Sequence, residues 1–359
     1  MNRPSRPALL PPLAAALLLV LGTAPGTATA APAAPAPGPA APAAPAAAAA
    51  VPQPLTGRNA GDRRIVALDP GIAETLCMLG AGHRLVGRTA HTVHPDDLRP
   101  LPVVCDRSGH PDYDALAALR PDLVILPEAM LTADAHRELG RRGIPHFALR
   151  NESLADLYQS VFELADRFDA AEGAVTWLSH MEVLTSEASA HVARALSATG
   201  LEPPRVLFVL GRNPVPPATV YVAGATSLQQ DVLAKLGLRN ACAERDAIAA
   251  MPFDRAAALL PDLIVEVRAD RRNADAAVLE SLEAWAGHPE VPAVRVGAVH
   301  VVPEAWPLFA GPRVENLHAL LATFAADWAS KAAETRAPAA PPAADGRASP
   351  PSTTPSPSP

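Results

Sequence analysis

The sequence predicts an α/β protein of two lobes, each with a parallel sheet flanked by helices, which are joined by one long connector helix. Three observations support this class. Short apolar runs alternate with amphipathic helical patterns, a helix–strand unit occurs twice, and residues 146–202 contain no proline in a chain that holds 41 prolines. The folded part excludes the two ends, which are rich in proline and alanine and poor in large apolar side chains.

The N-terminal end has the pattern of an export signal. Arg3 and Arg6 precede an apolar run over 13–21, and Ala28-Thr29-Ala30 follows as a small-residue cleavage site. Nine apolar residues are too few to span a membrane, so we expect a cleaved signal peptide over 1–30, with an uncleaved anchor as the alternative. No cysteine lies near the cleavage site, which predicts a periplasmic protein that is not a lipoprotein. We expect a disordered Ala/Pro-rich linker over 31–60 and a disordered Pro/Ser tail over 336–359.

The N-terminal lobe, 62–150, begins with a short buried strand over 64–68. An Asp69-Pro-Gly turn follows, and then a helix runs to Leu79, where Gly80 and Gly82 end it. Further apolar runs at 84–87, 123–126 and 145–149 predict three more strands.

An internal repeat relates this lobe to a C-terminal lobe over 204–330. Tyr113-Asp114 is followed, seven residues after the aspartate, by Pro121-Asp122 and an apolar strand. Phe253-Asp254 is followed at the same spacing by Pro261-Asp262 and another apolar strand. Residues 73–80 and 230–237 give a second echo, so two lobes of similar build are expected.

The proline-free segment predicts a connector helix over 170–200. Its apolar side chains recur every three or four positions and end near Gly200 and Pro203-Pro204: Val175, Leu178, Met181, Leu184, Ala188, Val192 and Leu196. Such a helix predicts a stiff connection between the lobes.

Composition excludes some classes of function. A formal net charge of −7 without a basic run disfavours a nucleic-acid binder. The chain has no GxSxG, HExxH, Walker A or GxGxxG motif, so no catalytic residues are predicted and an exported enzyme is the weaker alternative. Cys77 is expected to be buried, and Cys105 and Cys242 are either free or paired.

These motifs together resemble a known family. Ile65-Val-Ala-Leu-Asp-Pro-Gly-Ile-Ala-Glu-Thr-Leu is similar to the start of periplasmic cobalamin and ferric-siderophore binding proteins, and Leu101-Pro-Val-Val, 119–124, 204–210 and 236–240 resemble later signatures. The resemblance implies the substrate-binding subunit of an ABC importer, whose partners are a permease with its ATPase and a small-molecule metal chelate. The chelate is cargo, so no cofactor is expected, and we expect a monomer.

In this family an acidic residue at the start of a helix in each lobe docks onto the permease. The matching positions are Asp114 and Asp254, the two aspartates of the repeat. Two like charges related by pseudo-symmetry suit a two-fold permease and bidentate pairing with arginine. The alternative is that each aspartate caps its helix.

The resemblance places the ligand in a cleft between the lobes, at loops that leave the carboxyl ends of strands. Imidazole stacks on a chelate or ligates its metal, guanidinium meets carboxylate or phosphate, and indole packs on a flat face. The candidate ligand-binding residues are His91, His94, Arg107, His110, Arg212, Arg268 and Trp306.

Two departures from the family pattern bear on the ligand. Asp69 stands where the family has serine, which disfavours an anionic group at that helix start. Tyr113 is out of register with the tyrosine ligand of a heme-binding subgroup, so heme ranks behind cobalamin and siderophores. A receptor for free zinc or manganese that uses His91, His94 and His110 is the other alternative.

Overall fold

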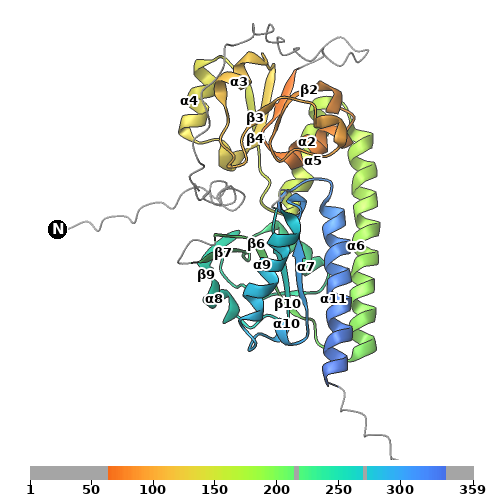
Figure 1. Ribbon diagram of the computed structural model, residues 1–359. Helices are drawn as coiled ribbons and strands as arrows, with labels where there is room; N and C mark the ends of the chain where they lie inside the picture. Colours follow the sequence, from red (N-terminus) through yellow and green to blue (C-terminus); the bar gives the residue numbers. More distant parts are fainter. Residues whose placement is uncertain (1–63, 214–217, 270–272, 337–359) are drawn as a thin grey trace, which may run out of the picture.

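The computed structural model describes residues 64–213, 218–269 and 273–336. The predicted signal peptide, the linker and all but the first residue of the predicted tail lie outside these described residues. Figure 1 shows the first lobe above the second, with the long helix α6 along one side of both.

The first lobe contains a five-stranded sheet in the order β3-β2-β1-β4-β5, and every pair is parallel. Its strands are β1 (Ile65–Ala67), β2 (Leu85–Thr89), β3 (Val103–Cys105), β4 (Leu123–Pro127) and β5 (His146–Leu149). Its helices are α2 (Pro70–Met78), α3 (Tyr113–Ala118) and α4 (Ala133–Arg141), with short 3-10 turns η1 (Gly82–Arg84), η2 (Asp96–Leu98) and η3 (Glu128–Met130). The four predicted strands are confirmed, and β3, which has three residues, was not predicted.

The strand order reverses between β1 and β4, which are neighbours in the sheet but not in the chain. Loops that leave the carboxyl ends of two such strands diverge and leave a crevice between them. Asp69 follows β1 and Glu128 follows β4. The topology therefore places both loops at one crevice of the first lobe.

The second lobe contains a six-stranded sheet in the order β11-β10-β6-β7-β9, with β8 also paired to β6. Its strands are β6 (Arg205–Asn213), β7 (Thr219–Ala223), β8 (Arg239–Asn240), β9 (Ile248–Pro252), β10 (Leu263–Val267) and β11 (Val299–Val302). Its helices are α7 (Leu228–Lys235), α8 (Phe253–Ala257), α9 (Ala274–Ala286) and α10 (Pro292–Arg295), with a 3-10 turn η4 (Trp306–Leu308).

This second sheet corrects the expectation of a wholly parallel sheet in one respect. Strand β7 is antiparallel to both of its neighbours, whereas β8, β10 and β11 run in the parallel direction. Only five residues separate Asn213 from Thr219, and a parallel crossover needs about a dozen or more. A connection this short therefore requires β7 to run antiparallel to β6.

The two copies of the internal repeat predicted from sequence make equivalent hydrogen bonds in the structure. Asp122 Oδ2 accepts a hydrogen bond from Arg64 N at 2.8 Å, and Asp262 Oδ2 accepts one from Arg205 N at 2.9 Å. Each aspartate thereby ties the start of its strand to the first strand of its lobe. The unit α3–β4 and the unit α8–β10 are therefore two copies of one supersecondary structure.

Helix α6 (Ala171–Thr199) is the long connector that the proline-free segment predicted. Gly200 ends it in the left-handed conformation, with φ of 65°. Helix α5 (Leu154–Phe168) precedes it and was not distinguished in the sequence, because only two residues separate the helices, of which Asp169 is left-handed. The C-terminal helix α11 (Val314–Arg336) packs along α6 (Figure 1).

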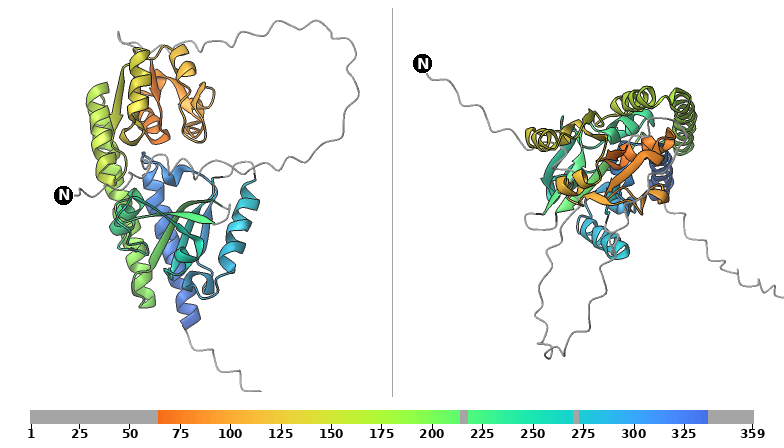
Figure 2. Two further views of the ribbon diagram at one scale, coloured as in Figure 1. Left: turned by 90° about the vertical axis from the view of Figure 1, so that its left-hand side faces the viewer. Right: turned by 90° about the horizontal axis from the view of Figure 1, so that it is seen from above.

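The lobes and the helices beside them share apolar contacts. One cluster of buried residues includes Ile65 of the first lobe, Met181 of α6, Phe208 of the second lobe and Leu321 of α11. The left view of Figure 2 shows α6 running beside both lobes, with α11 beside the second lobe. Among the described residues, no helix is both long and apolar enough to span a bilayer.

Candidate ligand-binding site

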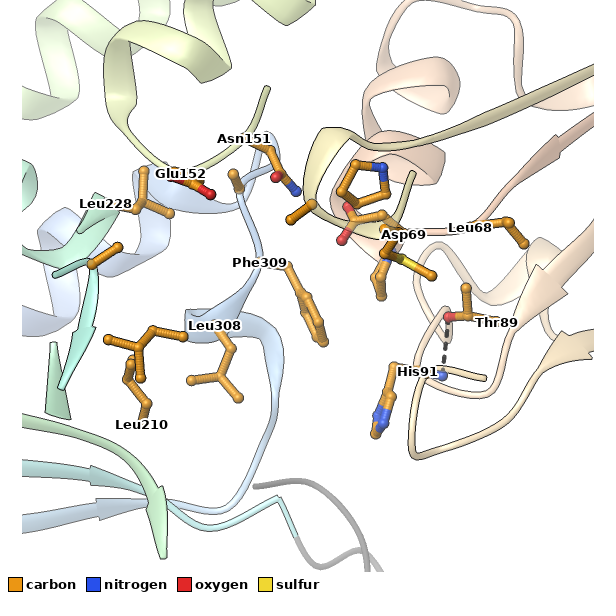
Figure 3. A pocket seen from close by; sticks show the side chains of 18 of the residues that line it. Leu68, Asp69, Thr89, His91, Asn151, Glu152, Leu210, Leu228, Leu308 and Phe309 are labelled. Carbon is orange, nitrogen blue, oxygen red and sulfur yellow. Dashed lines mark hydrogen bonds between the residues drawn. The ribbon is translucent and has the colours of Figure 1, made fainter. Parts of the chain in front are cut away.

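A cavity lies between the two lobes and encloses about 950 Å³ of space free of atoms, part of it open to solvent (Figure 3). We call it the main cavity. Its apolar lining includes Leu68 of the first lobe and Leu210, Leu228, Leu308 and Phe309 of the second. Its size and apolar walls are those of a small-molecule site.

The fold explains why the main cavity forms at this place. Leu68 and Asp69 follow β1, and Ala129 follows β4, so both arms of the first-lobe crevice contribute. Leu210 comes from the carboxyl-terminal half of β6, and Phe309 follows η4 in the opposite lobe. Each lobe therefore supplies one wall.

Asp69 is the most perturbed acid of the main cavity. Its Oδ1 accepts a hydrogen bond from Ile72 N at 3.0 Å and caps α2. Burial raises the pKa of Asp69 to about 7, and the charge of Glu74 acts in the same direction. Asp69 therefore exchanges a proton near neutral pH inside the cavity.

The polar lining of the main cavity is acidic. Three carboxylates contribute, from Asp69, Asp106 and Glu152, together with the amides of Asn151 and Gln229. No lysine or arginine is among the described residues that line it. These acceptors suit a ligand surface that donates hydrogen bonds or carries positive charge.

The rings of His91 and Phe309 approach each other from opposite lobes at one side of the main cavity (Figure 3). Their centroids are 6.0 Å apart and their planes are tilted by 40°. His91 Nε2 donates a hydrogen bond to the Arg107 carbonyl at 3.0 Å, which fixes the imidazole. Both rings also line a second cavity.

We call this second space the side cavity. It encloses about 740 Å³, partly open to solvent, and it also lies between the lobes. Its first-lobe wall includes His94, Arg99 and Arg107, and its second-lobe wall includes Trp306 and Arg313. The Arg313 guanidinium lies over the Trp306 indole, 6.0 Å from the ring centroid.

The structure brings together four of the seven candidate ligand-binding residues. His91, His94, Arg107 and Trp306 all line the side cavity, and His91 lines the main cavity as well.

His110, Arg212 and Arg268 line neither cavity. His110 is exposed, with its ring 3.8 Å from Asp106. Arg268 is held by Glu280 at 2.8 Å.

Arg212 is buried in the second lobe, where its Nε and Nη2 donate to Glu266 at 2.6 and 2.5 Å. Ser281 and Trp285 also donate to Glu266, so this carboxylate is fully engaged. The guanidinium of Arg212 is therefore committed to the core, and its placement speaks against a ligand contact.

The histidines do not form a metal site. Among the residues that the structure describes, no group of three or more His, Cys, Asp or Glu side chains is placed to hold a metal ion. His91 and His94 line the side cavity, whereas His110 lines neither cavity, so the three imidazoles of the free-cation alternative do not line one common cavity.

Sequence reasoning missed several residues of the main cavity. Phe309 had a usable signal, since it lies three residues after Trp306 in a chain with only 4% aromatic residues. Glu152 and Gln229 had none, because each is polar in a segment whose position relative to the cleft depends on the tertiary fold.

Asp114 and Asp254 are both exposed in the first turn of a helix, with 90% and 92% of each side chain accessible. Neither caps its helix: Asp112 caps α3, and α8 has no side-chain cap. The capping interpretation is therefore wrong for both. Asp114 Oδ1 accepts from Arg142 at 2.6 Å, whereas Asp254 lies 3.8 Å from His288.

Comparison with known proteins assigns this architecture. A family model described as "Periplasmic binding protein" matches residues 65–305. An uncharacterized ABC transporter substrate-binding lipoprotein of Bacillus subtilis, YvrC, is 24% identical over 255 residues, which cover 70% of this chain and 76% of that protein.

Solved structures share the fold. A periplasmic heme-binding protein from Pseudomonas aeruginosa is 25% identical, with 73% of this chain and 91% of that chain covered and a TM-score of 0.63. The vitamin B12 binding protein BtuF of Vibrio cholerae is 17% identical, with 76% and 98% covered and a TM-score of 0.59. The siderophore-binding protein FhuD of Vibrio cholerae is 19% identical, with 75% and 99% covered and a TM-score of 0.59.

Proposed function

Because the chain belongs to the periplasmic binding protein family, we propose that it captures a metal chelate and delivers it to the permease of an ABC importer. The chelate is a cobalamin-type corrinoid or a ferric siderophore. The mature protein acts as a periplasmic monomer, and it binds the chelate without converting it.

The observation that carries this proposal is the cavity between the lobes. Both lobes supply a wall, and the first-lobe wall lies at the crevice where the strand order reverses. A ligand in this cavity contacts both lobes at once, so ligand binding is coupled to the position of one lobe relative to the other. The exposed Asp114 and Asp254 lie one on each lobe, so their relative position is coupled to ligand binding as well.

The charge of the main cavity favours some chelates over others. Asp106 and Glu152, and Asp69 where it is ionised, repel an anionic surface, so a heme with two propionates or a ferric tris-catecholate is disfavoured. A corrin ring bears carboxamides, which donate hydrogen bonds to carboxylates, and a ferric hydroxamate is neutral or cationic. These two classes fit the lining.

A heme receptor is the second candidate, favoured by the likeness to the heme-binding protein from Pseudomonas aeruginosa. The family that the sequence resembles has a heme-binding subgroup, and that subgroup uses a tyrosine ligand. No tyrosine is among the described residues that line either cavity. Heme therefore remains behind the corrinoid and the siderophore.

Delivery requires contact with the permease. Asp114 and Asp254 present one exposed carboxylate on each lobe, at matching positions of the internal repeat. Arginines on a two-fold permease would pair with both.

The proposal is tested by measuring quenching of tryptophan fluorescence with cyanocobalamin, a ferric hydroxamate, a ferric catecholate, hemin and zinc. Saturation by a corrinoid or a siderophore at one equivalent, with the chelate recovered unchanged, is expected. A Trp306→Phe variant identifies the part of the signal that arises at the side cavity. Saturation by zinc alone, or chemical conversion of the chelate, would contradict the proposal.

A further inference from the structure

We propose that the side cavity binds an anionic arm of the same chelate whose body occupies the main cavity, with Arg107 as the principal contact. The arm is an oxyanion, either a phosphodiester or a carboxylate. This inference rests on the proposed function and extends it to a second compartment with a different ligand chemistry.

The two cavities differ in the polar groups that they present. The main cavity offers three carboxylates and no cationic side chain among its described lining residues. The side cavity offers the guanidinium groups of Arg99, Arg107 and Arg313 and the imidazole of His94. The main cavity therefore supplies mainly hydrogen-bond acceptors, and the side cavity supplies mainly hydrogen-bond donors.

Most of the positive charge in the side cavity is already balanced. Arg99 pairs with Asp96 at 2.9 Å, and Arg313 pairs with Glu74. Arg107 differs, because its guanidinium has no ion pair or hydrogen bond with any residue that the structure describes. Among the described residues that line this cavity, Glu304, exposed on the opposite wall, is the one that is acidic.

Arg107 also lies beside the edge that the main cavity and the side cavity share, where His91 and Phe309 line both. Its backbone carbonyl accepts the hydrogen bond from His91 Nε2, and His91 faces Phe309 at the shared edge (Figure 3). A ligand that passes this edge emerges beside the Arg107 guanidinium, which pairs with none of the described residues. The fork of N–H groups on arginine matches the oxygens of a phosphate or a carboxylate.

Trp306 supplies a flat apolar surface in the same compartment, with the Arg313 guanidinium over its ring. The combination of an indole face and an unpaired arginine suits an arm that carries a flat group next to its oxyanion. A corrinoid with a nucleotide arm has both parts: an amide-bearing ring for the acidic cavity, and a phosphodiester with a base for the side cavity.

The test compares two corrinoids that differ only in this arm. Dicyanocobalamin and dicyanocobinamide, both in excess cyanide, have the same ring and the same axial ligands, but only the first carries the phosphodiester arm. Affinities are measured by fluorescence titration for the unaltered protein and for Arg107→Ala and Arg107→Lys. Arg194→Ala, an exposed arginine on α6 that lines neither cavity, is the control for the charge change.

Arg107→Ala should weaken binding of the cobalamin about tenfold and leave the cobinamide within about twofold, as expected for loss of one charge-assisted contact. Arg107→Lys should recover part of the loss, and Arg194→Ala should change neither affinity. Equal effects of Arg107→Ala on both corrinoids, or no effect on either, would overturn the inference while the proposed function stands.

If neither corrinoid binds, the corrinoid form of the proposed function fails, and inorganic phosphate decides the inference. The side-chain Nε–Hε resonance of Arg107 is followed by NMR during a phosphate titration, with Arg194 as the internal reference. A saturable shift at Arg107 that exceeds the shift at Arg194 supports an oxyanion site. Equal shifts at the two arginines would overturn it.

Discussion

Arg313 Nε donates a hydrogen bond to Glu74 Oε2 at 2.8 Å, across the boundary between the lobes. A second hydrogen bond joins Arg313 Nη2 to Glu74 Oε1, so the pair is bidentate. Glu74 lies on α2 of the first lobe and is 5% exposed, whereas Arg313 precedes α11 and is 21% exposed. The pair therefore fixes the end of the second lobe to the first helix of the first lobe.

Removing one member of this pair should destabilise the protein more than removing both. Glu74→Leu leaves the Arg313 charge partly buried without a partner, at a cost of about 2–4 kcal/mol in the free energy of unfolding. The double variant Glu74→Leu/Arg313→Met should recover much of this loss. Urea denaturation of the unaltered protein, of Glu74→Leu, of Arg313→Met and of the double variant measures the coupling, and strictly additive losses would contradict it.

A backbone contact reinforces this junction. A Cβ atom on Gly71 would lie 2.1 Å from the carbonyl oxygen of Ala310, far inside van der Waals contact. Gly71→Ala should therefore force α2 away from the second lobe and destabilise the protein by about 1–3 kcal/mol. Thermal unfolding of this variant measures the effect.

Gly173 of α6 is the matched control for that substitution. A Cβ atom there would lie 3.6 Å from Leu79 Cδ2 and 4.0 Å from the Met78 carbonyl oxygen, which are ordinary contact distances. Gly173→Ala should stabilise the protein by up to about 1 kcal/mol, because alanine is the better helix former. If both alanine variants change the stability by the same amount, the close approach at Gly71 is not restrictive.

Arg212 should matter for folding and not for ligand affinity. Arg212→Met leaves Glu266, which is fully buried, without its ionic partner and should cost about 3–5 kcal/mol in the free energy of unfolding. At a temperature where the variant is folded, its chelate affinity should equal that of the unaltered protein. Normal stability with lost affinity would instead restore Arg212 as a ligand contact.

A structural feature is predictable from the sequence when the residues that determine it lie close together in the chain. Local signals were sufficient where one segment decides its own conformation, as for the end of α2 at Gly80, the length of α6 and the helix–strand repeat. Local signals were insufficient for Arg212. It lies near the carboxyl end of a strand, as several of the residues that do line the cavities also do. Its partner Glu266 lies 54 residues away on an apolar strand, and no local pattern reveals that pairing.

The two exposed aspartates should act in delivery and not in binding. Asp114→Asn and Asp254→Asn should leave chelate affinity within about twofold, because both lie outside the cavities. Uptake of labelled chelate by cells should fall several-fold in each variant and further in the double variant, as expected when charge pairing with a partner is lost.

Asp134 provides the control for the docking variants. It is also an aspartate in the first turn of a helix, α4, and 80% of its side chain is exposed. Asp134→Asn should leave uptake unchanged. If all three substitutions lower uptake equally, the effect reflects overall surface charge and the docking assignment fails.

Asp69 should make stability depend on pH in the acid range. Its pKa is about 7 in the folded protein against an ordinary value of 3.8, so the folded state binds the proton more tightly than the unfolded chain does. The neutral carboxyl therefore stabilises the protein fully below about pH 4. This contribution, on the order of 4 kcal/mol, is lost as the pH rises to about 7 and does not change further above it.

The variant Asp69→Asn tests this pH dependence. Its side chain cannot ionise and retains an oxygen that accepts from Ile72 N, so its stability should exceed that of the unaltered protein increasingly from pH 4 to pH 7. Urea denaturation of both proteins at intervals over this range measures the difference, and a constant difference would show that Asp69 ionises in the fold as it does in water.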